Sequence, residues 1–447
     1  MLAKFKKKYI GDWDFYQKYL LLAIPMILQN AITNLVSFLD NIMVGQLGTE
    51  QMSGVAIVNQ LIFVYNLAIF GAVSAASIFR AQYFGKGNHK GHMYSFRFKL
   101  YATLLVTGGA ILLFLTKGSA LISLYLTDTV GNGATDLALQ YGLEYLAIMM
   151  VGLIPFAVNQ SYATNIKETG QTFIPMLASF VAVGTNAILD YLMIFGIGPF
   201  PELGVQGAAL ATVIARYIEA LIVVIWAHIH RGKNRYLEGA YTSFGIPLAE
   251  LKAILIKGFP LMMNEVLWAA GMTTVTQCYS VRGLDVVAGL NIASTITNLF
   301  NIVYLQLGSC ISIVVGQYLG AGKLEDAKDA DNKMIVFSVF CCVIMAVLMF
   351  VVGGFFRGIY NTTEEIRELA TSFIAVSAII MPFCAFSHAS YFTLRSGGKT
   401  VVTFLFDSVF TWVIVVPAAY LLAHFTGLGI VSIYFLVQGT ELIKVII

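Results

Sequence analysis

The sequence predicts an all-α membrane protein with twelve transmembrane helices, arranged as two pseudo-twofold six-helix lobes around a central cleft. The first indication is composition: of 447 residues, 58% are hydrophobic and only 11% are charged, whereas about 25% of a soluble domain is charged. The second is the recurrence of apolar runs of about 20 residues, the length that crosses a bilayer. The third is an internal repeat at a fixed offset. Together these observations exclude an ordinary soluble enzyme.

Six apolar runs occupy the first half of the chain. Their approximate bounds are 16–43, 53–79, 98–117, 137–160, 172–197 and 205–228. Each is expected to be an α-helix, because a helix satisfies its own backbone hydrogen bonds where the bilayer offers no partners. The longest runs imply tilted or kinked helices rather than additional spans. The basic segment before the first run lacks a small-residue cleavage site, so we expect it to be retained.

Six further apolar runs follow in the second half. Their approximate bounds are 252–281, 287–317, 334–354, 368–390, 400–423 and 427–446. The connections between the runs are too short to hold a soluble domain. We therefore divide the chain into an N-terminal lobe, residues 1–235, which ends with a basic linker, and a C-terminal lobe, residues 236–447.

The placement of basic residues predicts the orientation of the chain. If the N-terminus is cytoplasmic, the cytoplasmic segments hold 22 of the 27 Lys and Arg residues. Such an excess marks the cytoplasmic side of a membrane protein. The expected location is the inner (plasma) membrane of a cell, with many passes through the bilayer and with both termini in the cytoplasm.

The two halves of the chain repeat each other at an offset of 235 residues. The paired positions include Pro25 with Pro260, Gly48 with Gly283, Gly54 with Gly289 and Asn66 with Asn301. Each half has an even number of spans, so the halves share one orientation and a pseudo-twofold axis along the membrane normal. Two such bundles facing a cleft favour an alternating-access transporter. A channel or a membrane enzyme with an old duplication is the alternative, although no nucleophile–base pair indicates an enzyme.

Two carboxylates lie inside the predicted spans of the first half. Asp40 is in the outer half of span one, and Asp190 is in the outer half of span five, one turn after Asn186. An ionisable residue in a span costs about 2.5–3.5 kcal/mol on insertion scales and is usually functional. These oxygens suit a cation such as sodium as ligands, or a proton as acceptors. The simpler alternative is two Asp side chains satisfied by neighbouring backbone or Asn groups.

The second half carries different charges. Glu265 lies near the middle of span seven, where it suits a second proton site, a counter-charge for a cationic substrate, or a helix-packing hydrogen bond. Asp407 in span eleven is a weaker candidate of the same kind. In span six, the three-residue spacing of Arg216 and Glu219 predicts a structural ion pair.

Small hydrophobic organic cations are the substrates that the composition favours. The chain has 16 Met, 32 Phe and 22 Tyr residues, which bind such cations through dispersion and cation–π contacts. The candidate residues for lining a binding cavity are Gln29, Asn34, Trp268 and Gln277. SGGKT at 396–400 lacks the first glycine of a phosphate-binding loop, so no use of ATP is expected. We expect no nucleic-acid partner and no cofactor apart from the coupling ion, and a monomer in the bilayer.

The chain resembles the multidrug and toxic compound extrusion (MATE) family of cation antiporters. The resemblance is carried by LDNIMVGQLGTEQMSGVA at 39–56, AQYFGKG and GQYLGAG, FPELGVQGAALATVIAR at 200–216 and NEVLWAAGMTT at 264–274. It implies secondary active efflux of organic cations in exchange for sodium or protons. A flippase for a lipid-linked precursor or polysaccharide, from the same superfamily, is the alternative function.

The resemblance also implies roles for particular residues. In one branch of the family, an Asp on helix one and an Asn-x-x-x-Asp pair on helix five form a cation site, and Asp40, Asn186 and Asp190 match them. A Thr on helix six completes that site in some members, for which Thr212 is the candidate. Another branch relies on an acid on helix seven, which Glu265 resembles. The mechanism that these roles suggest would bend helix one near Pro25.

Overall fold

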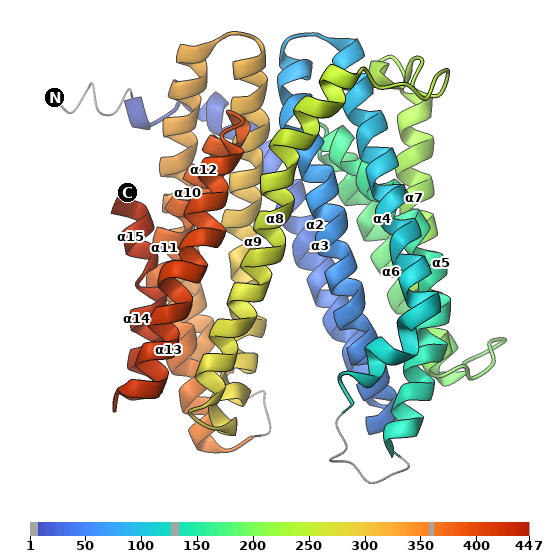
Figure 1. Ribbon diagram of the computed structural model, residues 1–447, viewed down its shortest axis with the longest axis vertical. Coiled ribbons are helices and arrows are strands. Elements are labelled where there is room, and N and C mark those ends of the chain that lie inside the picture. The colour runs from blue at the N-terminus through green and yellow to red at the C-terminus, as the bar shows by residue number, and fades with distance from the viewer. Residues whose placement is uncertain (1–7, 127–133, 357–361, 447) are drawn as a thin grey trace. The chain divides into compact units, whose positions relative to one another are not determined.

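The structure is a computed structural model that describes residues 8–126, 134–356 and 362–446, and the described chain is helical, without a strand (Figure 1). The first half contains α2 (Trp13–Gly45), α3 (Thr49–Gly85), α4 (His89–Ser123), α5 (Ala134–Glu168), α6 (Phe173–Phe195), α7 (Val205–Ile229) and the short η1 (Arg235–Leu237). The second half contains α8 (Leu248–Ser280), α9 (Leu284–Gly320), α10 (Leu324–Phe356) and α11 (Glu364–Ser396). It ends with α12 (Thr400–Phe404), η2 (Leu405–Val409), η3 (Thr411–Val415), α13 (Val416–Phe425), α14 (Ile430–Gln438) and α15 (Glu441–Ile446).

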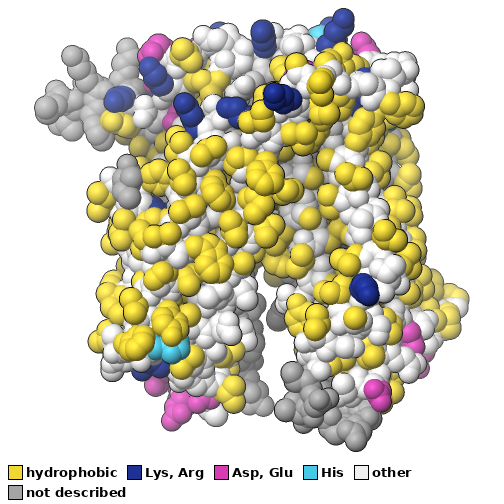
Figure 2. All heavy atoms as spheres, in the orientation of Figure 1, with side chains coloured by type: hydrophobic (Ala, Val, Ile, Leu, Met, Phe, Trp, Pro, Cys, Tyr) yellow, Lys and Arg dark blue, Asp and Glu magenta, His cyan; other side chains and the backbone are white. Residues whose placement is uncertain are grey.

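The predicted all-α membrane fold is confirmed. In the described chain, eleven helices are long and apolar enough to cross a membrane. Their outward faces are apolar rather than polar: Leu105 and Leu115 on α4 are 78% and 67% exposed. Figure 2 shows hydrophobic side chains over the middle of the helices, with Lys and Arg gathered at one end of them. This distribution is the one that a bilayer requires, because its core accepts apolar side chains and excludes charged ones.

The last two predicted spans differ from simple helices. Span eleven runs from Thr400 to Phe425, but its backbone widens into π-helical turns at η2 and η3. Pro417 follows directly and has no N–H to donate, which disturbs the hydrogen-bond ladder of the preceding turn. Span twelve is divided into α14 and α15, with Gly439 as the C-cap of α14.

The internal repeat reappears in the helix boundaries. α8 and α9 begin and end 235 residues after α2 and α3, respectively. The turn between the first pair of helices uses Gly48 at φ 143°, and the turn between the second pair uses Gly283 at φ 125°. Both values lie where only glycine avoids a steric penalty, so the repeat requires glycine at both turns.

The chain forms two compact units. Unit 1 comprises 1–27, 81–87 and 255–447, and unit 2 comprises 28–80 and 88–254. The division of the chain at residue 235 stays a prediction, because α2 and α8 each contribute residues to both units. In α2 the change of unit comes two residues after Pro25, a buried proline inside the helix.

Unit 2 packs α4, α5, α6 and α7 around the second half of α2 and most of α3. Near the loop that joins them, α6 and α7 approach closely: a Cβ on Gly207 would lie 2.6 Å from the carbonyl oxygen of Met193. Gly196 ends α6 in a left-handed conformation, with φ 65°. These glycines bring the polar side chains of the two helices together.

Unit 1 packs α9, α10 and α11 with the end of α3 and the first part of α2. The ends of α3 and α9 cross at small residues. A Cβ on Gly85 would overlap the carbonyl oxygen of Gln317, and a Cβ on Gly320 would overlap that of Gln82. Because 82 and 85 are the repeat partners of 317 and 320, the contact is reciprocal, as a twofold axis requires.

Candidate functional site

The strongest candidate site is formed by Asp40, Asn186, Asp190 and Thr212, all within unit 2. We call it the Asp190 site. Asn186 and Asp190 lie one turn apart on α6 and are only 6% and 1% exposed. The carboxyl group of Asp40, on α2, lies near that of Asp190. On α7, Thr212 Oγ1 accepts a hydrogen bond of 3.5 Å from Asn186 Nδ2. The structure thus brings the four predicted residues together.

Three of the four carboxylate oxygens of the Asp190 site are buried without a hydrogen-bond donor among the described residues. Neither oxygen of Asp190, nor Oδ1 of Asp40, accepts a hydrogen bond from any described residue. Two neighbouring carboxylates, one buried and one half-buried, repel each other unless a proton or a cation lies between them. The site also offers the amide oxygen of Asn186 and the hydroxyl of Thr212. Its chemistry is therefore that of a site for a proton or a small hard cation.

The predicted ion pair between Arg216 and Glu219 is wrong. Arg216 Nη1 donates to the carbonyl oxygen of Gly152 on α5 at 3.4 Å, and the guanidinium lies over the ring of Phe156, with its carbon 5.2 Å from the ring centroid. Glu219 Oε1 instead accepts a hydrogen bond from Ser179 on α6. The two side chains turn toward different helices, and this geometry overrides their favourable spacing on α7.

Gln29, a predicted substrate contact, is already engaged. Its Nε2 donates to Ser179 Oγ at 2.6 Å, while its Oε1 is buried without a donor. Gln29, Ser179 and Glu219 therefore form a polar chain across α2, α6 and α7. The other predicted substrate contacts are exposed within their units: Asn34 and Gln277 are exposed, and Trp268 is 38% exposed. Their role in substrate binding stays a prediction.

The acids of the second half lie in unit 1. Glu265 on α8 is half-buried, and no hydrogen bond or ion pair is found for it among the described residues. Asp407 lies in the π-helical turn η2, where Oδ2 accepts from Asn264 Nδ2 at 2.9 Å and Oδ1 lies 3.7 Å from Lys444 Nζ. Asp407 is thus held by neighbouring groups, whereas Glu265 is not.

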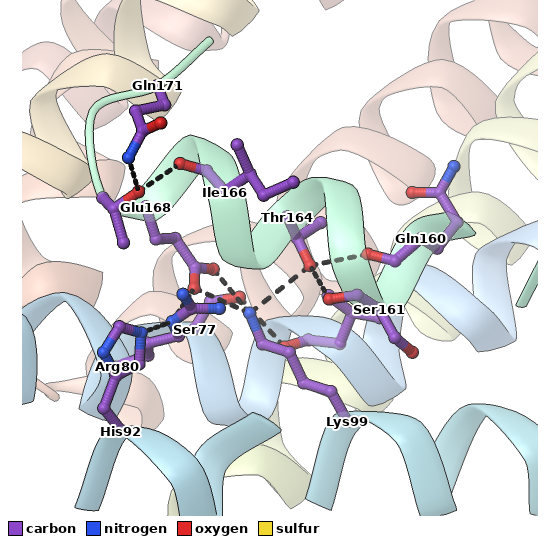
Figure 3. Close-up of polar contacts among 12 residues, drawn as sticks. Ser77, Arg80, His92, Lys99, Gln160, Ser161, Thr164, Ile166, Glu168 and Gln171 are labelled. Carbon is purple, nitrogen blue, oxygen red and sulfur yellow. Dashed lines mark hydrogen bonds and ion pairs between the residues drawn. The ribbon is translucent and has the colours of Figure 1, made fainter. Parts of the chain in front are cut away.

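A buried charged cluster at one end of unit 2 was not predicted (Figure 3). Lys99 Nζ lies 2.7 Å from Glu168 Oε1, and Arg80 Nε lies 3.5 Å from Glu168 Oε2. Arg80 also contacts His92, which the cluster buries. The Arg80 and Lys99 side chains are fully buried. The sequence did not reveal this cluster, because charge alone cannot distinguish a loop from a helix end covered by another segment.

The segment that follows α7 covers this charged cluster. The ring of Tyr236, in η1, packs against Arg80, whose guanidinium carbon lies 4.5 Å from the ring centroid. Burial raises the pKa of Tyr236 to about 12, which keeps the phenol neutral. Arg97 donates to the carbonyl oxygens of Gly239, Ala240 and Gly245. Arg80 and Arg97 therefore attach residues 236–245 to unit 2.

Comparison with known families agrees with the repeat and with the fold. A family model described as MatE matches residues 25–192 and again 260–421. The two matches begin 235 residues apart, at Pro25 and Pro260, which confirms the offset of the repeat.

Curated relatives are bacterial proteins. The probable multidrug resistance protein NorM of Thermotoga maritima is 23% identical over 413 residues, covering 92% of this chain and 86% of its own. A probable NorM of Halalkalibacterium halodurans is 24% identical over 413 residues, covering 92% and 88%.

Solved structures share the fold at 20% identity. An outward-facing multidrug resistance MATE family transporter of the MOP superfamily has a TM-score of 0.86, with 98% of this chain and 94% of that one covered. A MATE protein in a bent conformation has a TM-score of 0.85, with 97% and 93% covered. Because the family model matches most of the sequence, the chain belongs to the MatE family and is a multi-pass MATE transporter rather than an enzyme.

Proposed function

We propose that this transporter exports small hydrophobic organic cations in exchange for sodium ions or protons. The observation that carries the proposal is the Asp190 site, where two carboxylates meet without a donor inside a membrane-spanning bundle. A site of this kind gains most from binding a cation, because the ion removes the repulsion between the two acids. The names of the curated relatives, which are probable multidrug resistance proteins, support drug export.

The proposed cycle couples the ion to the drug through competition. From the outward-facing state, an ion binds at Asp40 and Asp190 and neutralises their charge. The altered bundle, with α2 bent near Pro25, loses affinity for the organic cation and releases it outside. Release of the ion inside resets the protein. Such coupling is reciprocal, so the drug must weaken ion binding by the same factor as the ion weakens drug binding.

Glu265 is the alternative coupling residue. It is the half-buried acid of unit 1 for which no partner is found among the described residues, so it suits a proton site or a counter-charge for the drug. We further propose a monomer with both termini in the cytoplasm, since most Lys and Arg residues fall on the side that this orientation makes cytoplasmic.

Dye transport in proteoliposomes tests the proposal. A fluorescent organic cation is supplied under an imposed sodium gradient or proton gradient, and wild type is compared with Asp190→Asn and Glu265→Gln. We expect gradient-driven transport in wild type and its loss in Asp190→Asn. Asp285→Asn is the matched control, because it makes the same change at an exposed carboxylate on α9.

Each outcome is decisive for one part of the proposal. The gradient that drives wild type names the coupling ion. Full gradient dependence in Asp190→Asn, together with its loss in Glu265→Gln, would move the coupling site to unit 1. If folded wild type moves no dye under either gradient, the cation-antiporter proposal fails and a flippase for a lipid-linked precursor takes its place.

A further inference from the structure

The polar chain of Gln29, Ser179 and Glu219, which we call the Glu219 cluster, has no part in the site described so far. It contains a membrane-embedded carboxylate, a hydroxyl and an amide, the same three kinds of group as the Asp190 site. Ser179 is 4% exposed, and its hydroxyl links the other two residues. In the described chain, no Lys or Arg forms an ion pair with Glu219, and Gln29 Oε1 is a buried acceptor without a donor. Among the described residues, the cluster therefore holds a carboxylate without a cationic partner and an amide oxygen without a donor.

The Glu219 cluster repeats the Asp190 site along the same three helices. Gln29 precedes Asp40 by eleven residues on α2, and Ser179 precedes Asp190 by eleven on α6. Eleven residues are close to three helical turns, so each pair lies on one helix face, about 16 Å apart. The two clusters are therefore two levels of one polar face.

On the third helix, α7, the step between the two levels is seven residues in the opposite chain direction, and it matches a seven-residue step on α6. Thr212 lies opposite Asn186, and Glu219 lies opposite Ser179. Both steps are seven residues, about two turns or roughly 10 Å. Since α7 runs antiparallel to α6, the two levels stay in register on all three helices. Such register places the clusters one above the other within unit 2.

Arg216 is the one charged residue of α7 between the two levels, and it faces another helix. Its guanidinium donates to Gly152 and packs on Phe156, both on α5. Between the two levels, the described buried positions are Val36 on α2, Ala182 on α6, and Val213 and Ala215 on α7. The described buried side chains between the levels are therefore uncharged, and α5 holds the guanidinium of Arg216.

We propose that the Glu219 cluster is a second binding site for the coupling ion, occupied between the Asp190 site and the end of unit 2 at which its part of α2 begins, at residue 28. In the orientation that the basic residues predict, that end is cytoplasmic. The ion moves from the Asp190 site to the Glu219 carboxylate, with Ser179 and Gln29 completing its contacts, before it is released. This inference rests on the proposed antiport, because it names the route by which the same ion leaves.

Infrared difference spectroscopy on purified protein tests the site without transport. Adding Na⁺ or acid shifts the stretching bands of carboxyl groups that take up the ion or proton. We expect Asp190→Asn to lose part of the wild-type difference spectrum and Asp190→Asn/Glu219→Gln to lose the remaining membrane-embedded part. Glu144→Gln is the matched control, because Glu144 on α5 accepts hydrogen bonds from Gln140 and Gln206. The control should leave the spectrum unchanged.

Dye exchange supplies the second readout. We expect Glu219→Gln to retain equilibrium dye binding and to slow ion-driven exchange about tenfold, the effect of raising a barrier by about 1.4 kcal/mol. Ser179→Ala, which keeps the acid but removes the bridging hydroxyl, should slow exchange less. The thermal unfolding midpoint of each variant shows whether it is folded.

The results separate this inference from the proposed function. If wild type transports dye and Glu219→Gln matches it in both spectrum and exchange rate, the second site is overturned and the antiport stands. If wild type moves no dye under either gradient, the antiport fails. An ion-dependent band that only Glu219→Gln removes would then still establish the site. Glu219→Gln could instead lower the thermal unfolding midpoint by the same amount with and without the ion and leave the difference spectrum unchanged. That result would show that Glu219 serves helix packing alone.

Discussion

At the residue scale, the buried charges separate into two groups with opposite consequences. In the Asp190 site no described Lys or Arg forms an ion pair with the two acids, and that charge imbalance is what an exchanged ion would remove. At the end of unit 2, Glu168 compensates both Arg80 and Lys99, so the charges hold the structure together. Burying a charge costs desolvation energy in both places. At the Asp190 site this cost indicates ion binding, whereas around Glu168 the ion pairs offset it and stabilise the fold.

The shared role of Glu168 predicts an order of mutational effects. Lys99→Met leaves Glu168 paired with Arg80, whereas Glu168→Gln removes the carboxylate that both buried cations share. Breaking a buried pair costs about 3–5 kcal/mol, and we expect Glu168→Gln to be the more destabilising of the two in thermal unfolding. Lys328→Met is the control, because its pair with Glu325 is exposed and such pairs contribute little. A larger loss in Lys99→Met would contradict the shared role.

The sequence predicted the residues of the Asp190 site better than it predicted their neighbours. An Asp and an Asn-x-x-x-Asp pair inside apolar runs stand out by their cost, and the family resemblance added Thr212. Arg216 and Glu219 failed as a pair because spacing along one helix says nothing of the helices beside it. Gly152 and Phe156 on α5, and Ser179 on α6, decided their contacts.

At the element scale, α2 contains both a residue of the Asp190 site, Asp40, and a proline that interrupts its backbone hydrogen bonds. Pro25 lies inside the helix and removes one hydrogen bond, and the helix passes from unit 1 to unit 2 just after it. The number and kind of helices followed from the hydropathy of the sequence. The π-helical turns at η2 and η3 did not, because their backbone geometry depends on Pro417 and on Asn264 contacting Asp407 and Ser408.

Replacing the proline of α2 tests its role as a hinge. Pro25→Ala restores a backbone donor in the helix interior, where proline costs about 3 kcal/mol. We expect a higher thermal unfolding midpoint together with slower gradient-driven dye transport. Pro175→Ala is the matched control, since Pro175 lies in the first turn of α6, where the N–H has no intrahelical acceptor. Transport at the wild-type rate in Pro25→Ala would remove the hinge from the mechanism.

At the scale of the whole molecule, the internal repeat was predicted correctly from the sequence, but the way in which it divides the chain into two units was not. An offset read from a few identities reappears in the bounds of two helix pairs and in two matches to one family model. The repeat did not predict that each unit would include segments from both halves of the chain. Residues 81–87, from the first half of the chain, pack with the second half because α3 and α9 cross at glycines.

The crossing makes a symmetric prediction about stability. Gly85 and Gly320 are equivalent under the repeat, and at each a Cβ would overlap a backbone carbonyl that cannot turn aside as a side chain does. Overpacking of this kind costs about 1–3 kcal/mol, so Gly85→Ala and Gly320→Ala should lower the unfolding midpoint by similar amounts. The double variant should cost less than the sum, because the first substitution already separates the two helices.

Replacing a helix glycine that has no close neighbours serves as the control, because it measures the gain in helix propensity without any overpacking. No atom within 4 Å would meet a Cβ on Gly109 of α4, and alanine there should stabilise the helix by about 0.5–1 kcal/mol. If Gly85→Ala and Gly320→Ala also stabilise the protein, the helices are not in backbone contact at the crossing. If only one of them destabilises it, the contact is not reciprocal, and the two repeats meet without the twofold relation that their sequences indicate.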